Sequence, residues 1–129
     1  MDNRYRILIV DDESYGRQLL EAVLLGENYD LVFAEDGQKA ISVIHEFLPD
    51  LVLLDVMMPE MDGFEVCQKI RSNERMMRLP IILITALDDS DSIKKGLKAG
   101  ANDYISKPFD PVKVLAKVKN LLKLSPPQV

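Results

Sequence analysis

The amino-acid sequence predicts one α/β domain in which helices cover both faces of a parallel sheet. Short apolar runs such as Leu51–Leu54 are bounded by Pro or Asp, as is typical of strands buried on both faces. These runs alternate with helical patterns five times, and this alternation favours right-handed crossovers in a doubly wound fold. The length of 129 residues suits a single domain with a substantial core.

The first half of the chain contains two strand-helix units. The strand 7–10 precedes a helical pattern from Glu13 to Leu25, and we expect Gly26 to cap that helix. The apolar stripe of this helix contains Tyr15, Leu19 and Val23, with Leu20 and Leu24 beside it. The strand 31–34 leads through the turn Asp36-Gly37 into a second helix, which Pro49 stops and whose apolar positions are Ala40, Ile41, Ile44 and Leu48.

The second half contains three further units. After the strand 51–55, the spacing of Asp62 and Glu65 predicts a capped helix whose inner face carries Phe64, Cys67 and Ile70. The strand 80–84 precedes a helix from Asp88 to Lys98, which has the thinnest apolar stripe and ends at Gly100. A short strand 103–105 follows, and the last helix begins with Asp110 as cap and Pro111 at its first position.

Composition excludes several classes of function. The net charge of −5 and the pI near 4.9 argue against nucleic-acid binding by this domain. A single cysteine rules out an internal disulfide and a cysteine-based metal site. No apolar stretch approaches the roughly 20 residues needed to cross a bilayer, and no signal peptide is visible. We therefore expect no membrane association and a cytoplasmic location.

Polar side chains follow four of the five predicted strands. They are Asp11 and Asp12, then Asp55, Thr85 and Lys107. The carboxyl ends of parallel strands share one edge of the sheet, where ligands bind in such folds. Three crowded carboxylates call for a cation, and their oxygen atoms suit Mg²⁺. A magnesium ion, a lysine and a hydroxyl donor stabilise a phosphoryl group in transit, and the available nucleophile is a carboxylate.

Four motifs carry a resemblance to a known family. They are 7–13 (ILIVDDE), 55–63 (DVMMPEMDG), Thr85-Ala86, and 100–109 (GANDYISKPF). In this order and at these separations they resemble the receiver domain of bacterial two-component response regulators, of the chemotaxis-regulator type. The resemblance covers about residues 5 to 124, nearly the whole chain.

The resemblance implies a fold and a set of roles. The fold is the flavodoxin-like sheet with strand order 2-1-3-4-5. Asp55 is the expected phosphoacceptor, and Mg²⁺ is held by Asp12, Asp55 and the backbone carbonyl of Met57, with Asp11 acting through a water. Lys107 and Thr85 are expected to bind the phosphoryl group, and Tyr104 to act with Thr85 as a switch. The Lys107-Pro108 peptide is expected to be cis.

The resemblance also implies a function and partners. We expect a signalling module, rather than an enzyme acting on outside substrates, that takes its phosphoryl group from a sensor histidine kinase or phosphotransfer protein. The surface of the fourth helix, fifth strand and last helix is the expected contact for an output domain or a second copy. Residues 1–124 form the expected receiver domain, and 125–129 read as a tail or the start of a linker. A stand-alone regulator and a fragment of a longer protein both remain open.

Three other functions fit the residues less well. A phosphatase of the haloacid-dehalogenase type needs a second acid two residues after its nucleophile, where this chain has Met57. A nucleotide-binding protein needs a glycine-rich loop after the first strand, where Asp-Asp-Glu stands. A receiver-like module that is never phosphorylated has no need of an acceptor site, and all the residues of that site are present.

Some of these residues also have simpler interpretations. Asp11 and Asp12 alone could cap the first helix, and Tyr104 could simply pack. Cys67 is expected to be an inert core thiol and His45 a surface residue. The Asp88, Asp89 and Asp91 cluster is expected to start the fourth helix rather than bind a metal.

Overall fold

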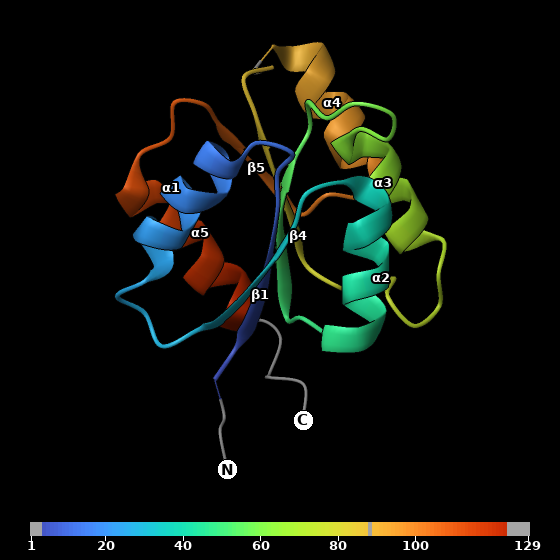
Figure 1. Ribbon diagram of the computed structural model, residues 1–129. Helices are drawn as coiled ribbons and strands as arrows, with labels where there is room; N and C mark the ends of the chain where they lie inside the picture. Colours follow the sequence, from blue (N-terminus) through green and yellow to red (C-terminus); the bar gives the residue numbers. More distant parts are fainter. Residues whose placement is uncertain (1–3, 88, 124–129) are drawn as a thin grey trace.

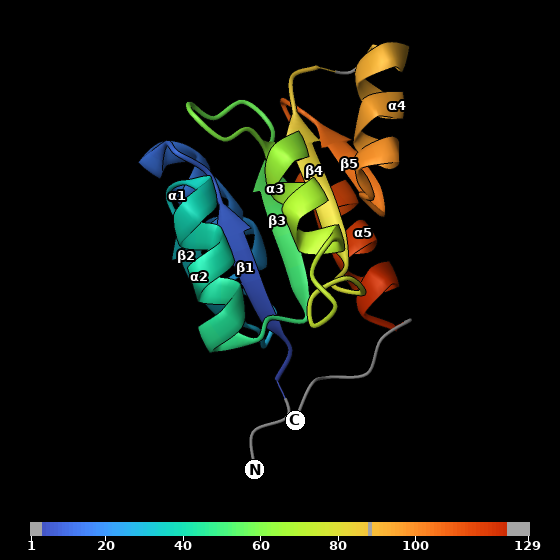
Figure 2. The same cartoon turned by 90° about the vertical axis from the view of Figure 1, so that its right-hand side faces the viewer.

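Five parallel strands form one sheet in the order β2-β1-β3-β4-β5, as predicted (Figures 1 and 2). The computed structural model describes residues 4–87 and 89–123. The strands are β1 (Arg6–Val10), β2 (Asp30–Ala34), β3 (Leu51–Asp55), β4 (Ile81–Thr85) and β5 (Asp103–Ser106). Because every strand runs the same way, all carboxyl ends meet at one edge.

Helices cover both faces of the sheet (Figure 1). On one face lie α1 (Ser14–Leu24) and α5 (Pro111–Lys123), and on the other lie α2 (Gly37–Phe47), α3 (Gly63–Arg71) and α4 (Ser90–Ala99). Side chains of β3 alternate between two hydrophobic cores: Leu51 and Leu53 join the α1/α5 core, whereas Val52 and Leu54 join the other. This alternation explains why the strand reads as a continuous apolar run.

Aspartate side chains cap four helices. Asp62 accepts a hydrogen bond from the Glu65 backbone N–H, and Asp110 accepts one from Val112, which confirms both predicted caps. Asp36 and Asp89 accept from Lys39 and Ser92 in the same way. Asp89 is therefore the residue of the acidic cluster that starts α4, and Asp88 lies outside the described residues.

Two predictions for the first helix are wrong. Tyr15 and Leu19 are 68% and 39% exposed, because the buried face of α1 is centred on Leu20 and Leu24. Gly26 does not cap the helix: Leu25 holds that position in a right-handed conformation, and Gly26 has no positive φ. The helix thus ends in an ordinary right-handed turn, which needs no glycine.

The connection 72–79 contributes two side chains to the core. Met76 and Leu79 are buried in the core on the α2/α3 side. Arg71 donates from Nε to the carbonyl of Gly100 at 2.8 Å and from a terminal nitrogen to Asn102 Oδ1 at 2.9 Å. The same Asn102 oxygen accepts the backbone N–H of Ile81 at 2.8 Å. These bonds tie the end of α3 to the turn between α4 and β5.

The predicted positions of Cys67 in the core and His45 at the surface are confirmed. Cys67 is buried, and burial raises the pKa of its thiol. His45 is exposed on α2.

Among the described residues no helix combines the length and apolar character that crossing a membrane requires.

Candidate functional site

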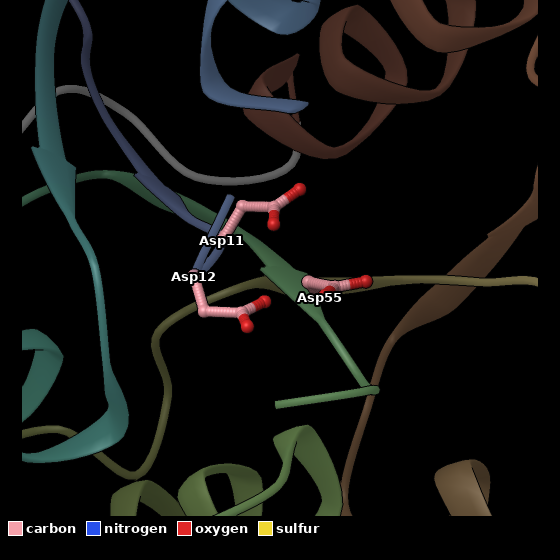
Figure 3. Close-up of side chains that lie close together, drawn as sticks. All are labelled: Asp11, Asp12 and Asp55. Atoms are coloured by element: carbon pink, nitrogen blue, oxygen red, sulfur yellow. The ribbon is translucent and has the colours of Figure 1, made fainter. Parts of the chain in front are cut away.

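The carboxyl edge of the sheet brings together the predicted acidic residues. Asp11 and Asp12 follow β1, Asp55 is the last residue of β3, and one oxygen from each of the three lies within 4.8 Å of the others (Figure 3). Figure 3 shows the three carboxylates gathered at the ends of β1 and β3. Asp11 and Asp55 are buried, each about 4% exposed, so water screens their charges poorly.

Lys107 supplies the positive charge at this edge. Its Nζ lies 3.0 Å from Asp55 Oδ1, within hydrogen-bond distance, and 3.9 Å from Asp11 Oδ2. The backbone N–H of Lys107 donates to the carbonyl of Thr85 at 2.8 Å, which aligns the end of β5 with that of β4. The following Lys107-Pro108 peptide is cis, as predicted.

The local environment raises the pKa of Asp55 to about 6. Burial is the main cause because it penalises the charged carboxylate, and the negative charges of Asp11 and Asp12 act in the same direction. The hydrogen bond and charge of Lys107 oppose the shift without cancelling it. For Lys107 itself burial lowers the pKa, but the bond to Asp55 and the nearby carboxylates outweigh burial, so its pKa is raised.

The residues present fit a divalent cation. Asp12 Oδ1 is buried and has no hydrogen-bond partner in the described part of the chain. An unpartnered buried carboxylate oxygen is costly unless an ion or water satisfies it. Three carboxylates around one point form an all-oxygen donor set, which suits Mg²⁺ with its remaining positions left to water.

Asp11 is held by its own loop and by α1. Its Oδ1 accepts the Glu13 backbone N–H at 3.0 Å, and its backbone carbonyl accepts a guanidinium N–H of Arg17 at 2.7 Å. Gly16 lies against the same carboxylate. The sequence reasoning missed Arg17 and Gly16, because no local spacing indicated that either would meet a residue preceding the helix.

A glycine after β3 also shapes the site. A Cβ on Gly63 would come within 2.5 Å of the Asp55 carbonyl oxygen, so only glycine lets α3 begin this close to the strand end. Gly63 N–H donates to the carbonyl of Val56 at 2.9 Å and closes the connection. The side chain of Met57 is 60% exposed.

The two predicted switch residues share a small cavity beneath α4. Thr85 and Tyr104 both line this space of about 10 Å³, with Leu87, Ile93 and Leu97 among the other lining residues. The Thr85 hydroxyl accepts the backbone N–H of Leu87 at 2.8 Å. Tyr104 is half-buried, and Lys117 Nζ lies 5.9 Å from its ring centroid. Asp55 pairs with Ile84 in the β3/β4 register, so Thr85, the next residue, is the member of the pair that lies beside the acidic cluster.

The fold and the site together define a doubly wound α/β protein with an acidic pocket at its topological switch point, between β1 and β3. The family model "Response regulator receiver domain" matches residues 7–119. The chain belongs to this family of two-component signalling proteins.

Two curated relatives that match this chain are response regulators, and they are longer than the chain itself. The response regulator PleD of Caulobacter vibrioides is 45% identical over 92% of the chain but only 26% of its own length. The DNA-binding response regulator MtrA of Mycobacterium tuberculosis is 42% identical over 93% of the chain and 51% of its own length. The chain thus spans about a quarter to a half of these relatives.

Solved structures share the whole fold. The chemotaxis protein CheY4 of Vibrio cholerae superposes with a TM-score of 0.87 at 28% identity, covering 92% of this chain and 99% of its own. A two-component response regulator from Clostridium difficile gives 0.86 at 30% identity, covering 93% and 97%.

Proposed function

We propose that the chain is the phosphoacceptor module of a two-component system. Asp55 accepts a phosphoryl group from a sensor histidine kinase or phosphotransfer protein, in a reaction that depends on Mg²⁺. Phosphorylation then changes the surface formed by α4, β5 and α5, which controls a partner or an output domain. The observation that carries this proposal is the buried Asp55, within hydrogen-bond distance of Lys107 and crowded by Asp11 and Asp12.

The reaction uses one carboxylate oxygen of Asp55 as the nucleophile. This oxygen forms a bond to phosphorus while the bond from phosphorus to the donor nitrogen breaks, and the donor imidazole leaves with the electron pair. The nucleophile must be deprotonated, and a pKa of about 6 leaves most Asp55 carboxylates charged at pH 7. Lys107 is positioned to shift its Nζ from the carboxylate to an oxygen of the incoming group.

Asp12, Asp55 and the backbone carbonyl of Met57 would hold the magnesium ion directly, and Asp11 would act through a bound water. When bound, the ion neutralises charge on the phosphoryl oxygens and so lowers the repulsion that the acidic pocket exerts on them. The unpartnered Asp12 Oδ1 supports this assignment, because it is the buried oxygen that lacks any other partner among the described side chains. The chain transfers the phosphoryl group only to itself, which makes it a regulator rather than an enzyme with an outside substrate.

The switch relies on Thr85 and Tyr104. A phosphorylated Asp55 gains about −1.5 to −2 of charge, and the Thr85 hydroxyl is a nearby donor that can turn toward it. The same hydroxyl accepts the Leu87 N–H at the connection leading into α4, so its rotation toward Asp55 would change this bond. Tyr104 lines the same small cavity and is large enough to fill the space that Thr85 leaves. Both changes act on α4 and β5.

What the module controls depends on its protein context. The relatives named response regulator PleD and DNA-binding response regulator MtrA are two to four times longer than the aligned region. We propose that residues 1–124 act as the receiver domain and 125–129, which lie outside the described residues, as a tail or linker. The α4-β5-α5 face would then meet an output domain, a separate partner or a second copy.

Mass spectrometry after treatment with a small acyl or amido phosphate tests the acceptor. We expect one added phosphoryl group in the presence of Mg²⁺, none in EDTA, and none in Asp55→Asn. Asp62→Asn is the matched control, because Asp62 caps α3 outside the acidic cluster and its loss should leave labelling unchanged. Undiminished labelling of Asp55→Asn would refute the assignment.

NMR with beryllofluoride, a phosphoryl mimic, tests the switch. Amide shifts should change across residues 85–98 and at Tyr104, and these changes should shrink in Thr85→Ala while those around Asp55 persist. Shifts confined to the loops around Asp55 in the parent protein would mean that the site binds the mimic without switching.

A further inference from the structure

Gly16 lies in the first turn of α1, against the carboxylate of Asp11. A Cβ on Gly16 would overlap Asp11 Oδ2 and come within 2.7 Å of Asp11 Cγ. The backbone does not require glycine here, because Gly16 is in a regular α-helix and Gly100 is the one described glycine with a positive φ. Glycine inside a helix is also less favourable than alanine. The physical reason for a glycine is therefore the space that Asp11 occupies.

The Asp11 carboxylate has two other neighbours that define its position. Oδ1 accepts the Glu13 N–H at 3.0 Å, and Oδ2 faces Lys107 Nζ at 3.9 Å. A methyl group on Gly16 would displace Oδ2, and rotation of the carboxylate moves both oxygens together. The Glu13 hydrogen bond or the approach to Lys107 must then be lost. The missing side chain at position 16 thus permits the present orientation of Asp11.

We propose that Gly16 is a positioning residue for the cation pocket. Its bare Cα lets Asp11 lie where one of its oxygens is within 4.8 Å of oxygens of Asp12 and Asp55. Any larger residue pushes the carboxylate out of this arrangement and weakens the pocket for Mg²⁺. The inference rests on the proposed Mg²⁺ dependence of the site. It assigns part of the affinity for Mg²⁺ to a residue that has no functional group.

Magnesium titrations followed by NMR amide shifts test the proposal on the unphosphorylated protein. We expect Gly16→Ala to bind Mg²⁺ about 10- to 100-fold more weakly, the range typical for loss of a residue that orients a ligand. Gly26→Ala is the matched control, because a Cβ there meets nothing within 4 Å, and it should bind as the parent does. If Gly16→Ala binds as tightly as the parent, the proposal is overturned while the proposed function stands.

A double-mutant cycle separates positioning of Asp11 from any other effect. In an Asp11→Ala background there is no carboxylate to displace, so adding Gly16→Ala should change Mg²⁺ affinity by less than about twofold. The double variant should also unfold at a higher temperature than Gly16→Ala alone, which keeps the test usable if the single variant folds poorly. An equal loss of affinity in both backgrounds would overturn the proposal, and a parent that binds no Mg²⁺ would overturn it together with the cation dependence.

Discussion

Two buried aspartates lie at opposite ends of the same strand, β3, and their surroundings differ. Asp50 precedes the strand and is 3% exposed, and Asp55 ends it and is 4% exposed. Asp50 Oδ2 accepts the Arg6 backbone N–H at 2.7 Å, and its own N–H donates to the Arg6 carbonyl at 2.7 Å. Asp55 faces two other carboxylates and one lysine. Burial alone therefore does not mark a functional carboxylate; the neighbours do.

The largest expected effect concerns pH and Asp55. Its pKa is about 6 in the folded protein and 3.8 as the ordinary value, so the folded state holds this proton more tightly than the unfolded state. The stability that this proton contributes is fully present below pH 4 and is lost as the pH rises toward 6. Over this range the free energy of unfolding should fall by about 2 to 3 kcal/mol. Without Mg²⁺, Asp55→Asn should thus gain stability relative to the parent between pH 4 and pH 7.

Urea unfolding in EDTA across this pH range measures that difference. The Lys107 pKa is raised from 10.5, so Lys107 stays protonated throughout and does not contribute to the slope. If the free energies of unfolding of the parent and of Asp55→Asn changed with pH in parallel, the prediction would fail. The neighbours of Asp55 would then compensate its burial as well as those of Asp50 do.

Replacement of Asp50 is expected to lower the stability of the protein, whereas replacement of Asp55 should raise it. Asp50→Ala leaves the Arg6 N–H without this acceptor, at a cost of about 2 kcal/mol in the free energy of unfolding. Asp50→Asn keeps an acceptor oxygen and should lose less. Phosphorylation of Asp55 should survive in both variants, because Asp50 is at the other edge of the sheet. A stable Asp50→Ala protein would show that the Arg6 contact contributes little.

A smaller effect comes from Mg²⁺ itself. At ten times its dissociation constant the ion should stabilise the parent by about 1.4 kcal/mol at pH 7. Thermal unfolding should show this gain undiminished in Asp50→Asn and reduced in Asp55→Asn, which removes one carboxylate charge from the pocket. An equal gain in stability for the parent, Asp50→Asn and Asp55→Asn would mean that Mg²⁺ binds at another site.

The fold followed from local signals in the sequence. The run Leu51–Leu54 predicted a strand buried on both faces, and Asp62 and Asp110 predicted helix starts. Caps and apolar periods depend on residues only a few positions apart. The strand-end rule also placed Asp11, Asp12, Asp55 and Lys107 at one edge, and the structure brings them together.

Contacts between distant segments were beyond such reasoning. Asn102 meets Arg71 across 31 positions, and the partner of a polar side chain at that distance depends on packing rather than on spacing. The exposure of Tyr15 followed from the rotation of α1 on the sheet, which its apolar residues constrain only loosely. Gly16 carried no visible signal, because a glycine that makes room for another side chain looks like any other glycine.

The brace from Arg71 to Gly100 and Asn102 has a consequence for how α4 can move. It fastens the carboxyl end of α4 to α3 and to the start of β4, and no such bond holds the amino end among the described residues. A helix anchored at one end behaves as a lever. With ten residues α4 is about 15 Å long, so a tilt of about 10° would carry Ser90 roughly 2.6 Å while Gly100 stayed in place. The fixed end of α4 would lie far from Asp55, and the end that moves most would lie nearest to Thr85.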